Sequence, residues 1–141
     1  MFEQTTDKNW SLLEKQVLET EYDIVRIRQL IRFHAKGIQM GIVDQTRITT
    51  AVSELLRNMY NYANGGEVQI EAGPVEGKMA LIITCSDHGP GIENLEMAMS
   101  DGYSSGLGLG YGLPGAKRLV DKFEIETKKT KGTTVRLIKW R

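Results

Sequence analysis

Residues 106–115 read GLGLGYGLPG, a run in which glycine alternates with larger residues up to Pro114. Eight of the chain's 15 glycines fall between Gly89 and Gly115, so the glycine content is concentrated in this part of the sequence. Pro114 suits the first turn of a helix, where its missing N–H costs little. Free backbone N–H groups at a helix N-terminus bind anions, and alternating glycines let the backbone wrap phosphates and move as a lid. We therefore expect a phosphate-binding loop here, with a flexible linker as the alternative.

The same run matches a second motif that we reject. Residues 110–115 fit GxGxxG, but a dinucleotide-binding fingerprint requires a strand that leads directly into the first glycine. Residues 104–109 are predicted to be a loop, and the sequence contains no GxxxxGK[ST] motif. Neither a Rossmann site nor a P-loop is expected.

Another glycine motif, DHGPGI, occupies residues 87–92 directly after an apolar strand predicted over 79–86. An Asp at the end of a strand, followed by two glycines, places an acceptor at the floor of a pocket and lets the backbone approach a flat ligand. Such a carboxylate accepts a hydrogen bond from an exocyclic amino group like that of adenine. A plain turn is the alternative, because Asp, Gly and Pro also favour turns.

The clearest helical pattern begins after Asp44 and ends before Asn64-Gly65-Gly66. Its apolar residues recur at spacings of four and three, whereas Glu54, Asn58 and Asn61 form a separate polar stripe on the flank. A carboxylate one turn before a carboxamide offers a general base beside an oxygen ligand for a hard cation such as Mg²⁺. A solvated helix flank is the alternative.

The remaining pattern predicts an α+β fold in one domain. We expect a tail at 1–15 and a domain at 16–141. Within the domain we expect a short strand at 16–20, a helix at 23–36 with Asp23 as its N-cap, and a helix at 114–122. We expect a hairpin at 67–86 with its turn at 73–77, and a second hairpin at 124–140. A short helix at 94–100 should precede a glycine-rich connection at 101–112. We interpret Tyr62 as a packing residue and Cys85 as a small core residue. Helices followed by hairpins favour a two-layer sandwich with a mixed, mostly antiparallel sheet covered on one face.

Composition excludes several classes of function. The chain of 141 residues has 18 basic and 18 acidic residues, so a net charge of zero gives no general attraction to nucleic acid or anionic lipid. A single cysteine and two histidines exclude a disulfide framework and a zinc cluster. No apolar run is long enough to span a bilayer, and we expect a cytoplasmic protein that binds neither membrane nor nucleic acid.

The order of the motifs resembles the Bergerat-type ATP-binding fold, the GHKL family of DNA gyrase, Hsp90, histidine kinases and MutL. Residues 54–58 resemble its N box, 87–92 its G1 box and 108–113 its G2 box. We expect a single domain here, without the further domains of most members. It therefore looks like the small serine/threonine kinases of the anti-sigma-factor type, and in particular the RsbT type of switch kinase in the bacterial stress response. This similarity covers roughly residues 20–141.

The resemblance implies roles for individual residues. Glu54 would be the base that activates the substrate hydroxyl, and Asn58 would coordinate Mg²⁺ bound to the phosphates of ATP. Asp87 would hold the adenine amino group, with assistance from Thr133. The remaining cofactor-binding residues would shape the base pocket and the phosphate lid: Gly89, Gly91, Ile92, Gly106, Gly108, Gly110, Gly112 and Leu113. Tyr111 departs from the family pattern, which more often has a small or aliphatic residue there.

The resemblance also implies partners. Such a kinase phosphorylates STAS-domain antagonist and scaffold proteins of a stressosome-like assembly and, when released, binds and activates a PP2C-type phosphatase. Two alternatives share the same ATP site: a partner-binding switch with little or no phosphotransfer, and an anti-sigma factor that binds a sigma factor directly.

Overall fold

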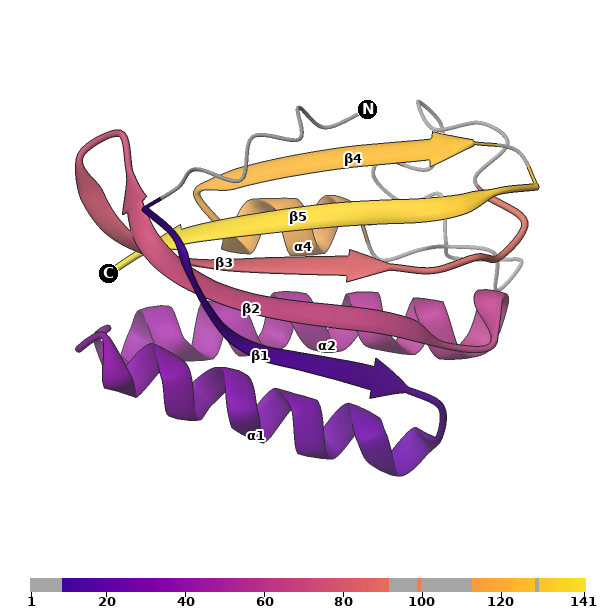
Figure 1. Cartoon of the computed structure of the whole chain (residues 1–141), viewed down its shortest axis with the longest axis horizontal. Coiled ribbons are helices and arrows are strands. Elements are labelled where there is room, and N and C mark those ends of the chain that lie inside the picture. Colours follow the sequence, from indigo (N-terminus) through magenta and orange to yellow (C-terminus); the bar gives the residue numbers. More distant parts are fainter. Residues whose placement is uncertain (1–8, 92–98, 100–112, 129) are drawn as a thin grey trace.

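The computed structural model describes residues 9–91, 99, 113–128 and 130–141, which form one five-stranded sheet and a layer of helices. The strands lie in the order β1-β2-β3-β5-β4, and every pairing between neighbours is antiparallel (Figure 1). The elements are β1 (Ser11–Leu18), α1 (Glu21–Gly37), α2 (Ile42–Ala63), β2 (Gly66–Val75), β3 (Lys78–Ser86), α4 (Leu113–Leu119), β4 (Lys122–Lys128) and β5 (Gly132–Trp140).

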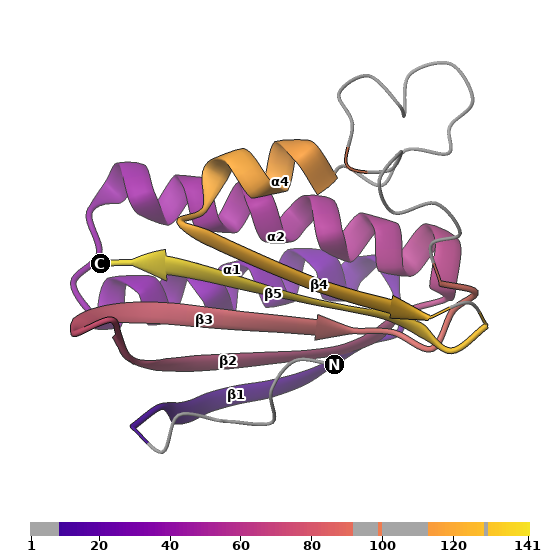
Figure 2. The same cartoon turned by 90° about the horizontal axis from the view of Figure 1, so that it is seen from above.

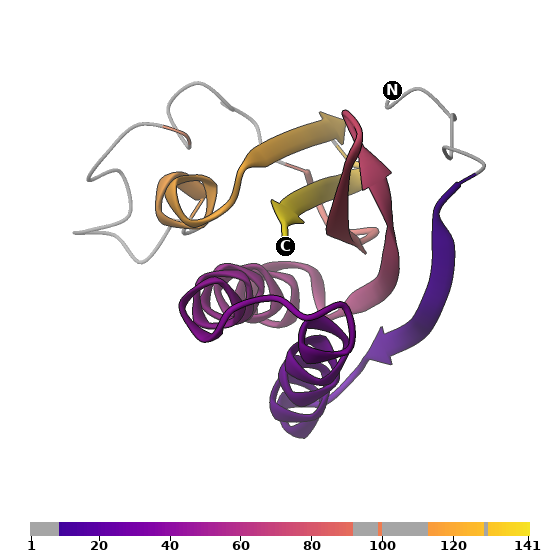
Figure 3. The ribbon, with the colours of Figure 1, turned by 90° about the vertical axis from the view of Figure 1, so that its left-hand side faces the viewer.

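The helices cover one face of the sheet, which confirms the predicted two-layer α+β sandwich. The end-on view in Figure 3 shows α1 and α2 on the same side of the curved sheet, with α4 beside α2. Figure 2 shows the same layering from above. The main core lies between these layers, and its largest fully buried side chains include Ile27, Ile48, Leu56, Ile83 and Leu137. A smaller cluster on the opposite face of the sheet is covered by Trp10 and Trp140.

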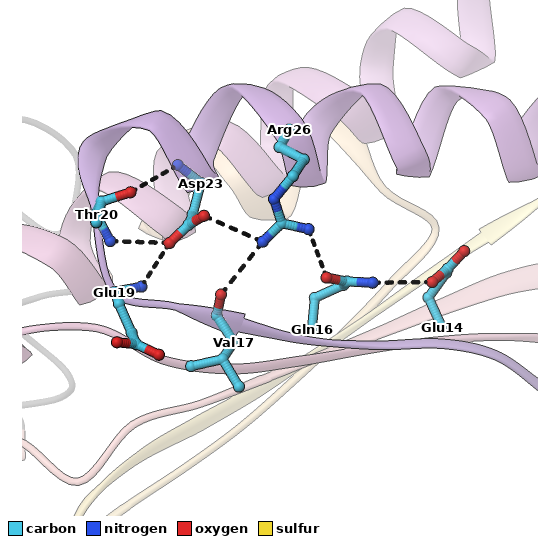
Figure 4. A network of polar contacts seen from close by, with 7 residues as sticks. All are labelled: Glu14, Gln16, Val17, Glu19, Thr20, Asp23 and Arg26. Carbon is cyan, nitrogen blue, oxygen red and sulfur yellow. Dashed lines mark hydrogen bonds and ion pairs between the residues drawn. The ribbon is translucent and has the colours of Figure 1, made fainter.

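Helix α1 begins earlier than predicted, because its N-cap is Thr20 and not Asp23. Asp23 is the third helical residue and completes a capping box: its carboxylate accepts from the backbone N–H of Thr20 at 2.9 Å, while the Thr20 hydroxyl accepts from the N–H of Asp23 at 3.3 Å. Figure 4 shows that Arg26 extends this network to Gln16 and Val17 of β1. The polar network thus fastens the first helix to the first strand.

Helix α2 agrees closely with its prediction. It begins at Ile42, slightly before the predicted start, and ends at Ala63. The C-cap residue Asn64 adopts a left-handed conformation. The next position, Gly65, requires glycine for two reasons. Its φ is +109°, and an added Cβ would lie 2.0 Å from the Leu18 carbonyl oxygen. The end of α2 is therefore pressed against the end of β1.

The first strand and the first hairpin differ from the sequence-based expectation. Strand β1 begins at Ser11, inside the predicted tail, and pairs with β2. Only Glu76 and Gly77 form the β2–β3 turn, and both have positive φ, which is typical of a two-residue type I′ turn. The predicted turn at 73–77 was too long because residues 73–75 continue β2 and pair with β3.

At the C-terminal end, α4 stops at Leu119, before the predicted end at Lys122. Lys122 and Phe123 instead begin β4 and pair with Ile138 and Leu137 of β5. The predicted short helix at 94–100 and the glycine-rich connection at 101–112 lie outside the described residues, apart from Met99. None of the described helices combines the length and the hydropathy needed to cross a membrane.

Candidate functional site

A cavity of about 130 Å³ lies between α2 and the ends of strands β3 and β5. Helix α2 contributes one wall through residues that share a stripe at spacings of three and four: Leu55, Asn58, Met59, Tyr62 and Ala63. The opposite wall comes from Cys85 and Val135 on the sheet and from the loop that follows β3. Leu113, at the start of α4, closes a further side and is buried. The cavity is thus largely apolar and has few polar groups, as in typical small-molecule sites.

Asp87 is the acidic residue of this cavity, and its carboxylate is held in place by the backbone. Its Oδ1 accepts hydrogen bonds from the N–H of Gly89 at 2.9 Å and from the N–H of Thr133 at 3.1 Å. Both bonds end on the same oxygen, and within the described residues Oδ2 has no partner and is available to a ligand. A ligand that donates a hydrogen bond, such as a ring with an exocyclic amino group, matches this acceptor.

Thr133 contributes to the site mainly through its main chain. Besides its N–H bond to Asp87, its carbonyl accepts from the N–H of Asp87 at 2.9 Å, which extends the β3–β5 ladder. Its hydroxyl lies 2.8 Å from the hydroxyl of Thr127 on β4. Thr133 therefore lines the cavity and also fixes the orientation of Asp87.

Asn58 carries a buried polar atom that the described residues do not satisfy. In this part of the chain its Nδ2 has no hydrogen-bond partner, although buried amide groups are nearly always paired. A half-turn of the side-chain amide would place Oδ1 where Nδ2 now lies. This rotation would break no hydrogen bond of the nitrogen. Within the described residues no cluster of three or more His, Cys, Asp and Glu side chains could hold a metal ion. A cation near Asn58 would therefore need most of its oxygen ligands from a bound substrate or from water.

Close backbone packing explains why glycines surround Asp87. A Cβ at Gly89 would lie 2.5 Å from the Cβ of Ala63 on α2, and one at Gly132 would lie 2.0 Å from the Asp87 carbonyl oxygen. Gly91 lines the cavity with a φ of +78°, in the region that favours glycine. The loop after β3 is thereby pressed against α2 on one side and against β5 on the other.

Cys85 is unsuited to nucleophilic chemistry. Burial raises the pKa of its thiol to about 12, and the negative charge of Asp87 adds to the rise. A thiol with such a pKa is protonated at neutral pH and is a poor nucleophile. Cys85 therefore serves as a small apolar side chain in the cavity wall.

Glu54 does not line this cavity, although it lies one turn before Asn58 on α2. It faces a second cavity of about 340 Å³ on the α1 side of the helix. Its side chain is 44% exposed, and its Oε1 lies 3.8 Å from Nη1 of Arg57. Asn61, the third member of the predicted polar stripe, is exposed to solvent. The predicted stripe is thus divided: Asn58 lines the apolar cavity, whereas the partly exposed Glu54 lines the second cavity.

Comparison with known proteins assigns the family. A model of the family "Histidine kinase-, DNA gyrase B-, and HSP90-like ATPase" matches residues 43–141, which include α2, the loop after β3 and strand β5. The chain belongs to this ATPase family. The match spans every residue that lines the apolar cavity.

Individual relatives place the chain within the ATPase family. It is 50% identical to the serine/threonine-protein kinase RsbT of Bacillus subtilis over 121 residues, which cover 86% of this chain and 91% of RsbT. It is 38% identical to an anti-sigma F factor of Clostridium kluyveri over 64% of this chain and 66% of that protein. An anti-sigma F factor of Caldanaerobacter subterraneus is 28% identical over 92% of this chain and 94% of its own length. The resemblance to small kinases of the anti-sigma-factor type is confirmed.

The structure brings together five of the predicted site residues of this ATPase at one cavity: Asn58, Asp87, Gly91, Leu113 and Thr133. Gly89 does not line the cavity, but it allows the loop after β3 to pack closely against α2. Five others lie outside the described residues: Ile92, Gly106, Gly108, Gly110 and Gly112.

Sequence reasoning missed the lining role of Tyr62, which we had interpreted as a packing residue. Its position one turn after Asn58 was the available signal, because residues four apart share a helix face. Cys85 was interpreted as a core residue, and it also forms part of the cavity wall. The alternation of apolar residues in a strand does not reveal which end of the strand borders a pocket.

Proposed function

We propose that this protein is a serine/threonine kinase that uses Mg-ATP to phosphorylate a STAS-domain antagonist or scaffold protein. Its 50% identity to the kinase RsbT over most of both chains supports this activity. The observation that carries the proposal is Asp87 beside an apolar cavity. Its Oδ1 is fixed by two backbone N–H groups, and its Oδ2 is left without a partner by the residues that the structure describes. A flat base with an exocyclic amino group fits these features.

The donor set of the cavity fits the nucleotide and its cation. Asp87 and Thr133 would hold the base, and the apolar wall from Leu55 to Ala63 would pack against it. Asn58, which has a buried amide group without a partner, would supply an oxygen ligand to Mg²⁺. We propose that Gly106, Gly108, Gly110 and Gly112, together with Ile92, complete the site. Bound Mg-ATP supplies the phosphoryl group and part of the positive charge that stabilises its transfer.

Glu54 is the proposed general base. Its partly exposed carboxylate can be reached by a serine or threonine of another protein, and it would accept the hydroxyl proton on one of its carboxylate oxygens. Arg57 holds this carboxylate from the same face of α2 at 3.8 Å. Glu54 thus lies on the side of α2 that is open to a protein substrate, while the nucleotide residues line the other side.

The experiment combines the protein with Mg-ATP and a purified STAS-domain protein and measures phosphate on the partner by intact mass. We expect the wild type to add one phosphate. Glu54→Gln should bind ATP with unchanged affinity and lose most of the transfer, because the amide cannot accept the proton. Full transfer by Glu54→Gln would refute the assignment of the base. An unmodified partner in the presence of normally bound ATP would refute the kinase.

We further propose that the protein, once released from its substrate, binds and activates a PP2C-type phosphatase in a cytoplasmic partner-switching cascade. Pull-down of the phosphatase with the phosphorylated and unphosphorylated STAS protein as competitors tests this step. Only the unphosphorylated competitor should displace the phosphatase.

The relatives named anti-sigma F factor favour a second candidate, in which the ATP-bound protein holds a sigma factor directly. ATP-dependent retention of a purified sigma factor on the immobilised protein, with no requirement for Glu54, would support this alternative.

A further inference from the structure

Two threonine hydroxyl groups meet across strands β4 and β5 beside the apolar cavity. Thr127 and Thr133 lie opposite each other in the β4–β5 ladder, and their Oγ1 atoms are 2.8 Å apart. Among the described residues, the lining of the cavity includes Thr133 but not Thr127. Thr127 is therefore placed to act on a bound ligand through Thr133.

The main chain of Thr133 is already committed to Asp87. Its N–H donates to Oδ1 of Asp87 at 3.1 Å, and its carbonyl accepts from the N–H of Asp87 at 2.9 Å. The side-chain hydroxyl is thus the polar group with which Thr133 can contact a ligand. A hydroxyl has one proton to donate and two lone pairs that accept, so its protein partner decides which of these it presents to the cavity.

The distances around Thr127 indicate the direction of the bond between the two hydroxyls. Oγ1 of Thr127 lies 2.8 Å from Oγ1 of Thr133, the usual length of an O–H···O bond, but 3.4 Å from the Gly132 carbonyl oxygen. If Thr127 donates to Thr133, its proton makes the short bond and the Thr133 proton is left for a ligand. In the reverse direction the Thr133 proton is used on Thr127, whose own proton is left with the long contact to Gly132. An acceptor atom of a ligand therefore favours donation from Thr127 to Thr133.

We infer that Thr127 is a positioning residue for base recognition, which donates to Oγ1 of Thr133 and so directs the Thr133 proton toward a ring nitrogen of the bound base. This inference rests on the proposed placement of the base at Asp87 and Thr133, and it extends that placement to the choice of base. Asp87 presents an acceptor, and Thr133 then presents a donor beside it. Adenine carries the complementary pair, an amino group next to a ring nitrogen without a proton.

The same pair of groups disfavours guanine. At the corresponding positions guanine has a carbonyl oxygen, which would face the Asp87 carboxylate, and an N–H group, which would face the Thr133 proton. Thr133 can accept from this N–H only if it turns its own proton toward Thr127, which moves the Thr127 proton to the 3.4 Å contact with Gly132. Polar groups left without a partner in an apolar cavity cost binding free energy. The hydroxyl of Thr127 therefore contributes to the preference for adenine.

Calorimetric titration tests the inference without any phosphoryl transfer. The ligands are ATP, GTP and the ATP analogue in which the ring nitrogen beside the amino group is replaced by C–H. The wild type should bind the analogue about 2- to 12-fold more weakly than ATP, as expected for the loss of one net hydrogen bond. Thr127→Val should remove most of this difference and should narrow the preference for ATP over GTP. Thr127→Ser keeps the hydroxyl and should behave like the wild type.

Thr134→Val is the matched control. Thr134 is the next residue of β5, but its hydroxyl donates to that of Ser86 at 3.3 Å, and it does not line the cavity. This variant should leave both preferences unchanged. Thr133→Val keeps the main-chain bonds to Asp87 and should abolish the penalty for the analogue. Addition of Thr127→Val to Thr133→Val should change neither preference further, and urea midpoints check that each variant is folded.

The outcomes separate the inference from the proposed function. If ATP binds normally and the penalty for the analogue is as large in Thr127→Val as in the wild type, the inference is wrong and the proposed function stands. A further change of preference when Thr127→Val is added to Thr133→Val would also overturn the inference, because Thr127 would then act by a route other than Thr133. Absence of ATP binding by the wild type would refute the proposed function and the inference together.

Discussion

Asp87 and Thr133 are joined by two hydrogen bonds, one to the Asp87 carboxylate and one between their main chains. The N–H of Thr133 donates to Oδ1 of Asp87 at 3.1 Å, and the N–H of Asp87 donates to the Thr133 carbonyl at 2.9 Å. The second bond continues the ladder between β3 and β5, so the regular sheet fixes the main chain at the floor of the apolar cavity. The first bond then sets which carboxylate oxygen remains for a ligand.

This arrangement predicts that Asp87→Asn weakens ligand binding but leaves the stability of the fold nearly unchanged. Asparagine keeps Oδ1 as an acceptor for Gly89 and Thr133 but replaces the available Oδ2 with an NH₂ group, which cannot accept. Leaving the amino donor of a bound base unpaired costs about 1–3 kcal/mol, or about 5- to 150-fold in affinity. Calorimetric titration with ATP measures the loss, and the unfolding midpoint in urea should change little. Unchanged affinity would show that Asp87 does not contact the nucleotide.

Two glycines predict opposite effects of the same substitution. Gly89→Ala should destabilise the protein by about 1–3 kcal/mol, because the new methyl group would meet Ala63 of α2 at 2.5 Å. Gly115 lies within α4, and among the described residues no atom outside its own helix turn lies within 4 Å of an added Cβ. Gly115→Ala should therefore stabilise the protein by about 0.5–1 kcal/mol. Urea denaturation of both variants checks the signs. A neutral Gly89→Ala would mean that the loop after β3 is not pressed against α2.

The capping box of α1 predicts a specific loss of stability in acid. Hydrogen bonds from the backbone N–H groups of Glu19 and Thr20, and from Arg26, lower the pKa of Asp23 from 3.8 to about 2. Because the folded pKa is the lower one, the contribution of Asp23 is complete above about pH 4 and is lost as the pH falls toward 2. Asp23→Asn should therefore be less stable than the wild type at pH 7 and equal to it near pH 2.

Urea midpoints of both proteins between pH 7 and pH 2 measure this difference. Glu21→Gln, which alters an exposed carboxylate of the same helical turn, is the control and should show no such convergence. A difference between Asp23→Asn and the wild type that stays constant over the whole range would contradict the role of the capping box.

Substitution of the buried Lys139 should lower the free energy of unfolding by a large amount. Its side chain is 8% exposed and lies 2.7 Å from the Asp121 carboxylate and 3.3 Å from that of Asp44. Burial raises the pKa of Asp121, but hydrogen bonds from Lys139 and from the N–H of Trp140 outweigh it and hold the pKa below its usual range. Lys139→Met would remove the lysine from Asp121, while Asp44 would keep its ion pair with Arg47. The substitution should cost about 3 kcal/mol of unfolding free energy.

Chemical denaturation at pH 7 measures this loss, and Lys15→Met on the exposed side of β1 is the control. Equal stability of Lys139→Met and the wild type would show that the buried ion pair contributes no net stabilisation.

The sequence predicted those elements whose apolar residues follow one clear period. Helix α2 is the best example, because its buried residues recur at spacings of three and four and glycines follow its C-cap. Strand β1 has no such signal: it lies at the edge of the sheet, only Leu18 is buried, and a bulge between Leu12 and Glu14 interrupts the alternation. The predicted N-cap of α1 was wrong because Thr20 and Asp23 both suit that position, and only the capping box distinguishes them.

The sequence predicted several residues of the candidate site, but it did not predict that Glu54 would lie in a different cavity from the others. Asp87, Asn58 and Thr133 were identified from their motifs, and the fold brings them to one cavity. The separation of Glu54 from that cavity depends on where α1 packs against α2, a tertiary contact that helical periodicity cannot reveal. For the same reason, Thr127 gave no signal in the sequence, since it meets Thr133 only after β4 pairs with β5.

The two cavities on opposite flanks of α2 have no lining residue in common. Substitutions that reshape the lining of one cavity therefore leave the lining of the other intact, so the two flanks can diverge independently among paralogues of this chain.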